Sequence, residues 1–230
     1  MIILIGGSSG IGKELIKELI KFDDIFTNNN KKKIDLKIRK TKKKLSFQKL
    51  DISKAENIKK FVDKNSKILR KITCINLAGV SVDKLIPNLN EKEVQKVYQI
   101  NAFSNIFFTK YLLKNMLKDN FGRFIHFTST RAIKGDVGIS LYASSKSSLI
   151  SFSRCISKEY GRFNITSNTV SLGYFESPLL NSIKKNIKEK LIQDIPSKKI
   201  GEVKNISNII IALMRSDYIN GADIKIDGGI

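Results

Sequence analysis

Tyr142 and Lys146 are two side chains that together could transfer a proton, and they stand four residues apart. A helix places residues four apart on one face, so the phenol and the ammonium group would point the same way. An unperturbed tyrosine has a pKa of about 10 and is a poor acid–base catalyst at neutral pH. Because a nearby ammonium group favours the phenolate, we expect Lys146 to lower the pKa of Tyr142 toward the working range.

Ser129 is a third candidate, thirteen residues before Tyr142 and just past the strand-like run Arg123–Thr128. Open α/β sheets bind their ligands at the carboxyl ends of strands. A hydroxyl group at that place could donate a hydrogen bond to a substrate oxygen as charge develops on it. The three residues therefore predict a site that transfers a proton to or from a substrate oxygen.

A glycine-rich turn near the N-terminus is suited to a pyrophosphate. The apolar run Ile2–Ile5 leads directly into this turn, and a helix-like stretch follows. Gly6 and Gly10 let the backbone turn tightly and approach phosphate, while Gly12 lets the helix pack close to the strand. The helix N-terminus adds free N–H groups and a positive dipole end. The predicted contacts in this turn come from Gly6, Ser8, Ser9, Gly10, Ile11 and Gly12.

The residues after the second strand-like run bear on the choice of cofactor. An acidic residue there would bind the ribose 2′-hydroxyl and favour NAD. The run Ile25–Thr27 leads instead into Asn28, further asparagines and the lysines of Lys31–Lys33. A 2′-phosphate would meet amides, lysines and the hydroxyls of Ser8 and Ser9. We therefore expect NADP(H), with NAD(H) possible because these lysines could equally form a solvated loop.

Strand-like and helix-like runs alternate along the chain and predict the frame that positions these residues. The helix-like runs are Ile11–Phe22, Ala55–Ile68, Glu91–Leu117, Leu141–Tyr160 and Val203–Arg215. The strand-like runs are Ile2–Ile5, Ile25–Thr27, Leu45–Leu50, Ile72–Leu77, Arg123–Thr128, Ile165–Val170 and Asp223–Ile226. This order predicts an α/β protein with a Rossmann-like, doubly wound parallel sheet and helices on both faces.

No linker rich in proline or glycine divides the chain, so we expect a single domain over residues 1–230 that both binds the dinucleotide and carries the catalytic residues. A polar segment, residues 173–201, contains its own short helix-like stretch. Because it follows the sixth strand-like run, we expect it to form a substrate lid. The basic segment Lys31–Lys44 is expected to be a loop or a short helix.

The net charge of +21, from 42 basic and 21 acidic residues, first suggests a nucleic-acid partner. The lysines are spread along the chain, with one cluster at Lys31–Lys44, and no nucleic-acid-binding motif accompanies them. We therefore expect no nucleic-acid partner. No apolar run approaches the roughly 18 residues of a membrane helix, so no membrane span is expected either.

The two cysteines and the single histidine suggest no metal site. Cys74 and Cys155 have neither metal-ligand spacing nor a disulfide pattern, and we interpret both as small core residues. A reduced, cytoplasmic location fits this usage. His126 lies in the middle of a strand-like run, where a packed strand residue is the usual interpretation.

Together these residues resemble the classical short-chain dehydrogenase/reductase family over essentially the whole chain. The glycine turn, the spacing of Ser129, Tyr142 and Lys146, and the ending Asp227-Gly228-Gly229 carry the resemblance. It implies that Asp51 contacts the adenine, that Asn101 is catalytic, and that Ser177 takes the place of a nicotinamide-binding threonine. It adds the following cofactor-binding residues: Ile52, Asn76, Ala78, Gly79 and Gly173.

The resemblance also implies a role for each catalytic residue. Tyr142 would donate a proton to the carbonyl oxygen during reduction, and Ser129 would hold that oxygen. Lys146 would lower the pKa of Tyr142 and bind the nicotinamide ribose. Asn101 would hold a water molecule that links Lys146 to solvent. The cofactor would supply the hydride, and the protein would supply position and electrostatics.

Within the family, residues 195–202 and 218–229 most resemble 3-oxoacyl-[acyl-carrier-protein] reductases. An acyl carrier protein is acidic, so basic residues would suit it as a partner. Close relatives with the same motifs act on sugars, sugar nucleotides and other small alcohols, which stays an alternative. A regulatory dinucleotide-binding protein would need no Tyr142 and Lys146 pair. The basic candidates for docking are Lys158, Arg162, Lys184, Lys185 and Lys188.

The helix-like runs Glu91–Leu117 and Leu141–Tyr160 carry more apolar residues than one sheet face needs. On a monomer the remainder would form an exposed apolar patch. In the resembled family the equivalent helices pair across a two-fold axis. We therefore expect a homodimer or a homotetramer.

Overall fold

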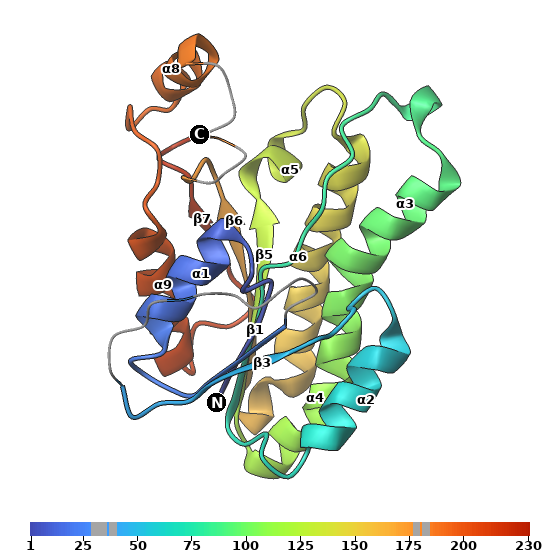
Figure 1. Ribbon diagram of the computed structural model, residues 1–230, viewed down its shortest axis with the longest axis vertical. Coiled ribbons are helices and arrows are strands. Elements are labelled where there is room, and N and C mark those ends of the chain that lie inside the picture. The colour runs from blue at the N-terminus through green and yellow to red at the C-terminus, as the bar shows by residue number, and fades with distance from the viewer. Residues whose placement is uncertain (29–35, 37–40, 177–179, 181–184) are drawn as a thin grey trace.

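The computed structural model describes residues 1–28, 36, 41–176, 180 and 185–230. Its centre is a parallel sheet of seven strands in the order β3-β2-β1-β4-β5-β6-β7 (Figure 1). This arrangement confirms the predicted doubly wound α/β fold. The strands are β1 (Ile2–Ile5), β2 (Ile25–Asn28), β3 (Leu45–Gln48), β4 (Ile72–Asn76), β5 (Gly122–Ser129), β6 (Ile165–Leu172) and β7 (Asp223–Ile226).

The apolar strands alternate their side chains between two cores, one on each face of the sheet. Ile2 and Leu4 of β1 belong to one core, and Ile3 and Ile5 belong to the other. On the first face lie α1 (Gly10–Leu19) and α9 (Val203–Arg215), while the second face is covered by α2 (Ala55–Asn65), α4 (Ser104–Asp119) and α6 (Ser140–Tyr160) (Figure 1).

The long helix predicted over Glu91–Leu117 is interrupted. Its first part is α3 (Glu91–Tyr98), which begins at a capping box between Asn90 and Glu93. A π-helical turn, η2 (Gln99–Phe103), then joins α3 to α4. Asn101 is at the centre of η2, so the interruption falls on a predicted catalytic residue.

Three short elements went unpredicted, namely α5 (Thr130–Lys134) and the 3₁₀ turns η1 (Ile86–Asn88) and η3 (Gly161–Phe163). Ser129 is the last residue of β5, not the first residue beyond it. In the polar segment after β6, the structure has α8 (Lys185–Asp194). Most of the basic segment Lys31–Lys44 lies outside the described residues.

The two cysteines differ. Cys74 is buried in β4, as expected, whereas the core interpretation of Cys155 is wrong because its side chain is exposed. On α6, Ser153 and Ile156 are buried and face the sheet. Cys155 lies between them on the exposed side of the helix, so it points away from the sheet. Cysteine is too small and too neutral in polarity for its type alone to tell which helix face it occupies.

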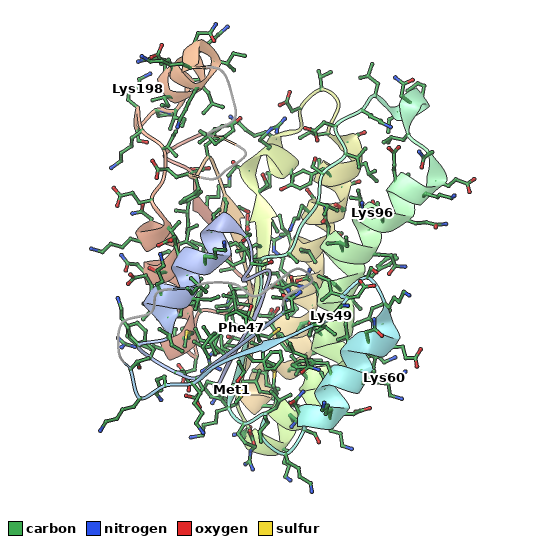
Figure 2. The ribbon with its side chains drawn as sticks, in the orientation of Figure 1. Met1, Phe47, Lys49, Lys60, Lys96 and Lys198 are labelled. Atoms are coloured by element: carbon green, nitrogen blue, oxygen red, sulfur yellow. The ribbon has the colours of Figure 1, made fainter. Side chains whose placement is uncertain are left out.

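The basic side chains are distributed over several elements. Figure 2 shows Lys49, Lys60, Lys96 and Lys198 on separate segments, and all four are exposed. Among the helices of the described ranges, none combines the length and apolar character needed to cross a membrane.

Candidate active site

The site lies at the carboxyl ends of β1, β4 and β5, where the strand order reverses. In open α/β sheets this reversal opens a crevice for ligands. The turn after β1 and the loop after β4 approach closely here, because a Cβ added to Gly6 would lie 3.0 Å from the amide nitrogen of Ala78. Gly6 also has a φ of 90°, which a residue with a side chain rarely adopts.

The structure brings Ser129, Tyr142 and Lys146 together at this edge. Tyr142 and Lys146 lie in the first turns of α6, and the phenol of Tyr142 is hydrogen-bonded to the side chain of Ser129. Lys146 is buried, and its Nζ donates to the carbonyl oxygens of Ala78 at 3.1 Å and Phe127 at 2.9 Å. Its ammonium group therefore links the loop after β4 to β5.

Burial is the main influence on the phenol of Tyr142, and it raises the pKa. The hydrogen bond from Ser129 and the positive charge of Arg131 lower it, and the negative charge of Asp83 raises it. The expected lowering of this pKa is therefore wrong for this structure: the pKa is raised, and the groups that lower it are Ser129 and Arg131, not Lys146. Burial lowers the pKa of Lys146 itself to about 8.

Asn101 is fully buried and is bound to the loop after β4. Its Oδ1 accepts from the amide of Val80 at 2.8 Å, and its Nδ2 donates to the carbonyl of Val80 at 2.9 Å. Nδ2 also donates to Oγ of Ser145 at 2.9 Å. Asn101 thereby holds in place the loop whose Ala78 carbonyl receives Lys146. The water-binding role implied by the resemblance stays a prediction.

The glycine turn fits a pyrophosphate. Ser9 caps α1 by accepting from the amide of Gly12 at 3.0 Å, and its hydroxyl donates to the carbonyl of Gly6 at 2.9 Å. The first α-helical bond runs from Lys13 to Ser9, so the amides of Gly10 and Ile11 precede the helical ladder. No acidic residue lies in the first turn of α1, which leaves its positive dipole end uncompensated.

The predicted adenosine contacts are placed only in part. Asn28 does not face outward as expected for a 2′-phosphate ligand, because its Oδ1 accepts from the amide of Gly6 at 2.8 Å. Asp51 is exposed in the turn after β3, and hydrogen bonds from Ser53 lower its pKa. Ile52 beside it is buried. Asn29, Asn30, Lys31, Lys32, Lys33, Lys184 and Ser177 lie outside the described residues.

The remaining predicted residues support the backbone of the site. Asn76 accepts from the amide of Ala78 at 3.1 Å and so shapes the loop after β4. A Cβ on Gly79 would lie 3.0 Å from Nζ of Lys146, and one on Gly173 would lie 2.6 Å from Cα of Asp227. Gly173 therefore needs to be glycine because a backbone atom is in the way, whereas a side chain at position 79 would require Lys146 to shift.

Four residues of the site were missed by the sequence analysis. Val80 acts through its backbone groups, which every residue has, so its sequence gives no signal. Ser145 has serine neighbours, and nothing in the sequence distinguishes it from them. Arg131 and Asp83 act on Tyr142 through charge. The position of Arg131, two residues after Ser129, was the one available signal.

His126 is buried in β5 and its pKa is lowered to about 3, mainly by burial and further by Lys146. Its Nδ1 lies 2.8 Å from Oδ1 of Asn105. The interpretation as a packed strand residue is confirmed.

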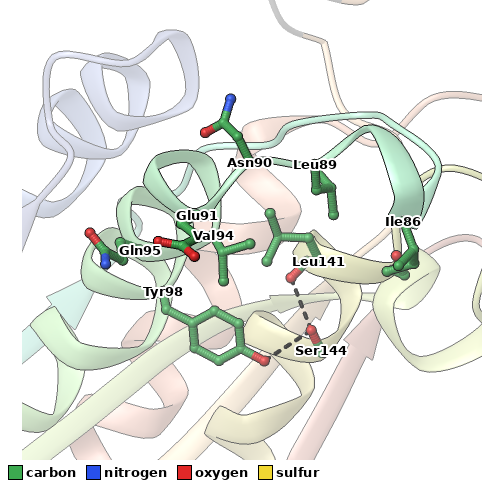
Figure 3. Close-up of a pocket in the computed structure, with 10 residues that line it drawn as sticks. Ile86, Leu89, Asn90, Glu91, Val94, Gln95, Tyr98, Leu141 and Ser144 are labelled. Atoms are coloured by element: carbon green, nitrogen blue, oxygen red, sulfur yellow. Dashed lines mark hydrogen bonds between the residues drawn. The ribbon is translucent and has the colours of Figure 1, made fainter.

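A groove of about 690 Å³ lies beside the N-terminal part of α6 (Figure 3). Tyr98 crosses it, and its hydroxyl donates to Oγ of Ser144 at 3.0 Å. Ser144 belongs to α6, the helix that carries Tyr142 and Lys146. The groove therefore borders the catalytic helix. The other lining residues are Ile86, Leu89, Asn90, Glu91, Val94, Gln95, Ser140 and Leu141.

Comparison with known proteins gives a consistent picture. The family model for short chain dehydrogenases matches residues 1–188. A 3-oxoacyl-[acyl-carrier-protein] reductase of Buchnera aphidicola subsp. Baizongia pistaciae is 28% identical, with 99% of this chain and 96% of the relative covered. Carbonyl reductase family member 4 of Xenopus laevis is also 28% identical, covering 98% of this chain and 95% of the relative.

Among solved structures, levodione reductase superimposes with a TM-score of 0.88 at 21% identity, covering 99% of this chain and 96% of the other. At that identity the likeness bears on the fold. The family match, the glycine turn at the strand-order reversal and the Ser129–Tyr142 contact lead to the same conclusion: the chain belongs to the short-chain dehydrogenase/reductase family, oxidoreductases that bind a nicotinamide dinucleotide.

Proposed function

We propose that this protein is an NADP(H)-dependent 3-oxoacyl-[acyl-carrier-protein] reductase that acts in fatty acid synthesis in the cytoplasm. The observation that carries the substrate is the full-length similarity to curated reductases of that name. The motifs at residues 195–202 and 218–229 favour the same substrate. Neither observation depends on the catalytic residues, which any carbonyl reductase of the family would share.

Each residue of the site has a role in this proposal. Ser129 holds the keto oxygen, and Tyr142 delivers a proton to it. The raised pKa keeps the phenol protonated at neutral pH, which suits the reducing direction. Lys146 binds the nicotinamide ribose, and Asn101 fixes the loop against which Lys146 rests. The bound nicotinamide supplies the hydride.

The remaining site residues hold the cofactor. The amides of the turn from Gly6 to Gly12 bind the pyrophosphate at the N-terminus of α1. NADP(H) is favoured because the sequence after β2 holds asparagines and lysines but no carboxylate. The adenosine and nicotinamide ends are assigned to Asp51, Ile52, Asn76, Ala78, Gly79, Gly173 and Ser177, while Asn28 supports the glycine turn through its hydrogen bond to Gly6.

We assign docking of the acidic carrier to α8. Lys185 and Lys190 are exposed on this helix, in the predicted lid segment. Lys158 and Arg162 are poorer candidates, because they lie near the other end of α6. At 1.5 Å per residue the helix places them about 24 Å or more from Tyr142.

Activity assays test the proposal. Oxidation of NADPH and of NADH is followed with acetoacetyl-[acyl-carrier-protein], the neutral acetoacetyl-N-acetylcysteamine thioester, and a panel of sugars. We expect turnover of both thioesters and a preference for NADPH. Tyr142→Phe should lower kcat at least about 100-fold while leaving NADPH affinity intact, since the hydroxyl acts only in proton transfer. Turnover of a sugar without turnover of either thioester contradicts the proposal.

A charge-reversal pair tests the docking surface separately. Lys185→Glu combined with Lys190→Glu should raise KM for the carrier-bound substrate and leave KM for the neutral thioester unchanged. Lys158→Glu is the matched control and should affect neither value. Equal effects of the two changes would exclude α8 as the docking surface.

A further inference from the structure

A line of buried polar side chains runs through the protein beside the site. Its members are Ser153 on α6, Ser167 on β6, His126 on β5 and Asn105 on α4. Each of the four is at most 2% exposed. Burying a polar side chain costs free energy unless it is hydrogen-bonded. Four such side chains in a row therefore indicate a connected hydrogen-bond network.

In this line, the donor and the acceptor of each hydrogen bond follow from the bond that the neighbouring side chain makes. Asn105 donates through Nδ2 to the backbone carbonyl of Asn101 at 2.9 Å, so its Oδ1 accepts from Nδ1 of His126 at 2.8 Å. Nε2 of the neutral ring is then an acceptor, and Oγ of Ser167 donates to it at 3.3 Å. Oγ of Ser153 lies 2.9 Å from Ser167 and donates to it. Because the pKa of His126 is about 3, the ring stays neutral and this direction persists at physiological pH.

The line closes into a ring of contacts through the catalytic helix. From Asn101, Nδ2 donates to Oγ of Ser145 at 2.9 Å, and Ser145 donates to the carbonyl of Tyr142 at 2.8 Å. The hydrogen bonds therefore leave α6 at Ser153, cross β6, β5 and α4, and return to α6 at Ser145. Asn101 is the point at which they meet the site.

The π-helical turn η2 explains why such a connection is useful. In η2 the backbone pairing is one residue wider than in an α-helix, since the amide of Ser104 bonds to the carbonyl of Gln99. Side chains from the start of α4 donate further hydrogen bonds to backbone carbonyls of η2. Ser104 Oγ bonds to the carbonyl of Ile100 at 2.6 Å, and Asn105 bonds to that of Asn101. A π-turn is rare because it is less favourable than the α-helix around it, so it needs such support.

We propose that Asn105 and His126 are positioning residues for the reaction. They hold η2 in its π-helical form, and η2 in turn sets the place of Asn101, of the loop it binds, and of Lys146. His126 fixes the orientation of the Asn105 amide, and Asn105 fixes the carbonyl of Asn101. The kinetic part of this proposal rests on the proposed reductase function, whereas the structural part does not.

Two substitutions of His126 separate this role from simple core packing. In His126→Asn the side-chain amide nitrogen stands close to the place of Nδ1, so it still donates to Asn105. In His126→Gln the amide reaches the place of Nε2 and keeps only the contact with Ser167. Asn105→Leu removes the contact altogether. Thr109→Val is the control on α4, because the Thr109 hydroxyl is buried and has no hydrogen-bond partner among the described residues.

Hydrogen exchange of the backbone amides in residues 99–104 measures the structural part, and kcat and KM with NADPH and the acetoacetyl thioester measure the kinetic part. In Asn105→Leu and His126→Gln we expect exchange to rise at least about tenfold. We expect kcat to fall about tenfold with KM changed less than twofold, since small misplacements near the reacting atoms are costly. His126→Asn and Thr109→Val should stay within about twofold of the unaltered protein in both measurements.

Equal exchange rates in His126→Asn and His126→Gln would overturn the proposal, and so would an unchanged kcat in His126→Gln. If Asn105→Leu does not fold, the two His126 variants still decide. A protein that reduces no acetoacetyl thioester would overturn the proposed function instead, and the contrast in hydrogen exchange would then still test the support of η2.

Discussion

At the scale of single residues, the charge balance around Tyr142 is set by two residues outside the predicted catalytic group. Arg131 lowers the pKa of Tyr142, and Asp83 raises it. Both belong to segments that meet at the mouth of the site, where the amide of Lys84 bonds to the carbonyl of Gly138 at 2.8 Å. Beyond burial and Ser129, the pKa of Tyr142 is therefore set by the opposing charges of Arg131 and Asp83.

We predict opposite shifts in the pH profile when these two charges are removed. Reduction needs the protonated phenol, so activity is lost as pH rises through the pKa of Tyr142. Arg131→Met removes a cation that favours the phenolate and should move the alkaline limb of kcat/KM to higher pH. Asp83→Asn should move it to lower pH. Shifts in the same direction would show that the limb belongs to another group.

His126 should make the folded protein sensitive to mild acid. Its pKa is about 3 in the fold against an ordinary value of 6.5, so the unfolded chain takes up a proton that the folded protein excludes. Its contribution to stability is complete above pH 6.5 and is lost as pH falls toward 3. Between pH 6.5 and 5 the loss is about 2 kcal/mol, at about 1.4 kcal/mol per unit.

Urea unfolding at pH 7 and pH 5 measures this loss. His126→Asn should retain about 2 kcal/mol more of its own pH 7 stability at pH 5 than the unaltered protein does. Carboxylates titrate in both proteins, and their contributions cancel in this comparison. An identical loss in the two proteins would show that His126 does not resist protonation.

At the scale of elements, the turn from β1 into α1 depends on close backbone packing. A Cβ on Gly12 would lie 2.4 Å from the carbonyl oxygen of Gly6 and 2.7 Å from Cα of Gly7. Neither backbone atom can move without changing the conformation of the turn that we propose binds the phosphates. Gly161, at the end of α6, offers a contrast, because a Cβ there would meet only the side-chain amide of Asn220 at 3.2 Å.

We therefore predict that Gly12→Ala weakens NADPH binding at least about tenfold and lowers the free energy of unfolding by about 1–3 kcal/mol. Gly161→Ala should change both by much less, because its Cβ would crowd one side-chain atom at 3.2 Å and no backbone atom. Fluorescence titration and urea unfolding measure the two quantities. Unchanged NADPH affinity in Gly12→Ala would separate this turn from the phosphate site.

Much of this arrangement could be predicted from spacing alone. The alternation of runs gives the parallel sheet, and the four-residue spacing of Tyr142 and Lys146 places them on one helix face. The π-turn at Asn101 could not be predicted, because residues on both sides of it are helical and apolar in the usual pattern. The direction of the Tyr142 pKa was missed for a related reason, since burial depends on the whole fold.

Asn28 shows the same limit at the cofactor end. It was expected to follow a strand ending at Thr27, but it is the last residue of β2, and its amide oxygen accepts from Gly6 of the neighbouring turn. A residue type at a strand end predicts that a side chain is near a ligand, and it does not predict which neighbour the side chain contacts. That choice is made by the register between β1 and β2, in which Leu4 faces Thr27.

At the scale of the whole molecule, apolar side chains remain exposed along α3, η2 and α4. Val94, Phe103 and Ile106 are each between 37% and 39% exposed, and α3 and η2, which carry the first two, contact α6. The groove in Figure 3 lies between α3 and the start of α6. We propose that a second copy of the chain covers this face, in a homodimer or homotetramer.

We predict that Phe103→Asp shifts the protein to monomers and lowers its activity, because α6 carries Tyr142 and packs against the same face. Ile68→Asp is the control, since Ile68 is exposed between α2 and β4. Light scattering at micromolar concentration, with activity measured on dilution, is the test. A fully active monomer of the unaltered protein would refute the assembly.

The central place of β1 also has a consequence for synthesis on the ribosome. β1 pairs with β2 on one side and with β4 on the other, and all four of its residues are apolar and buried. A ribosome adds roughly 5–20 residues per second, so this strand exists for seconds before β4 has been made. Throughout that interval Ile2–Ile5 lacks its partner on one side, so an apolar strand stays incompletely paired while the rest of the sheet is still being made.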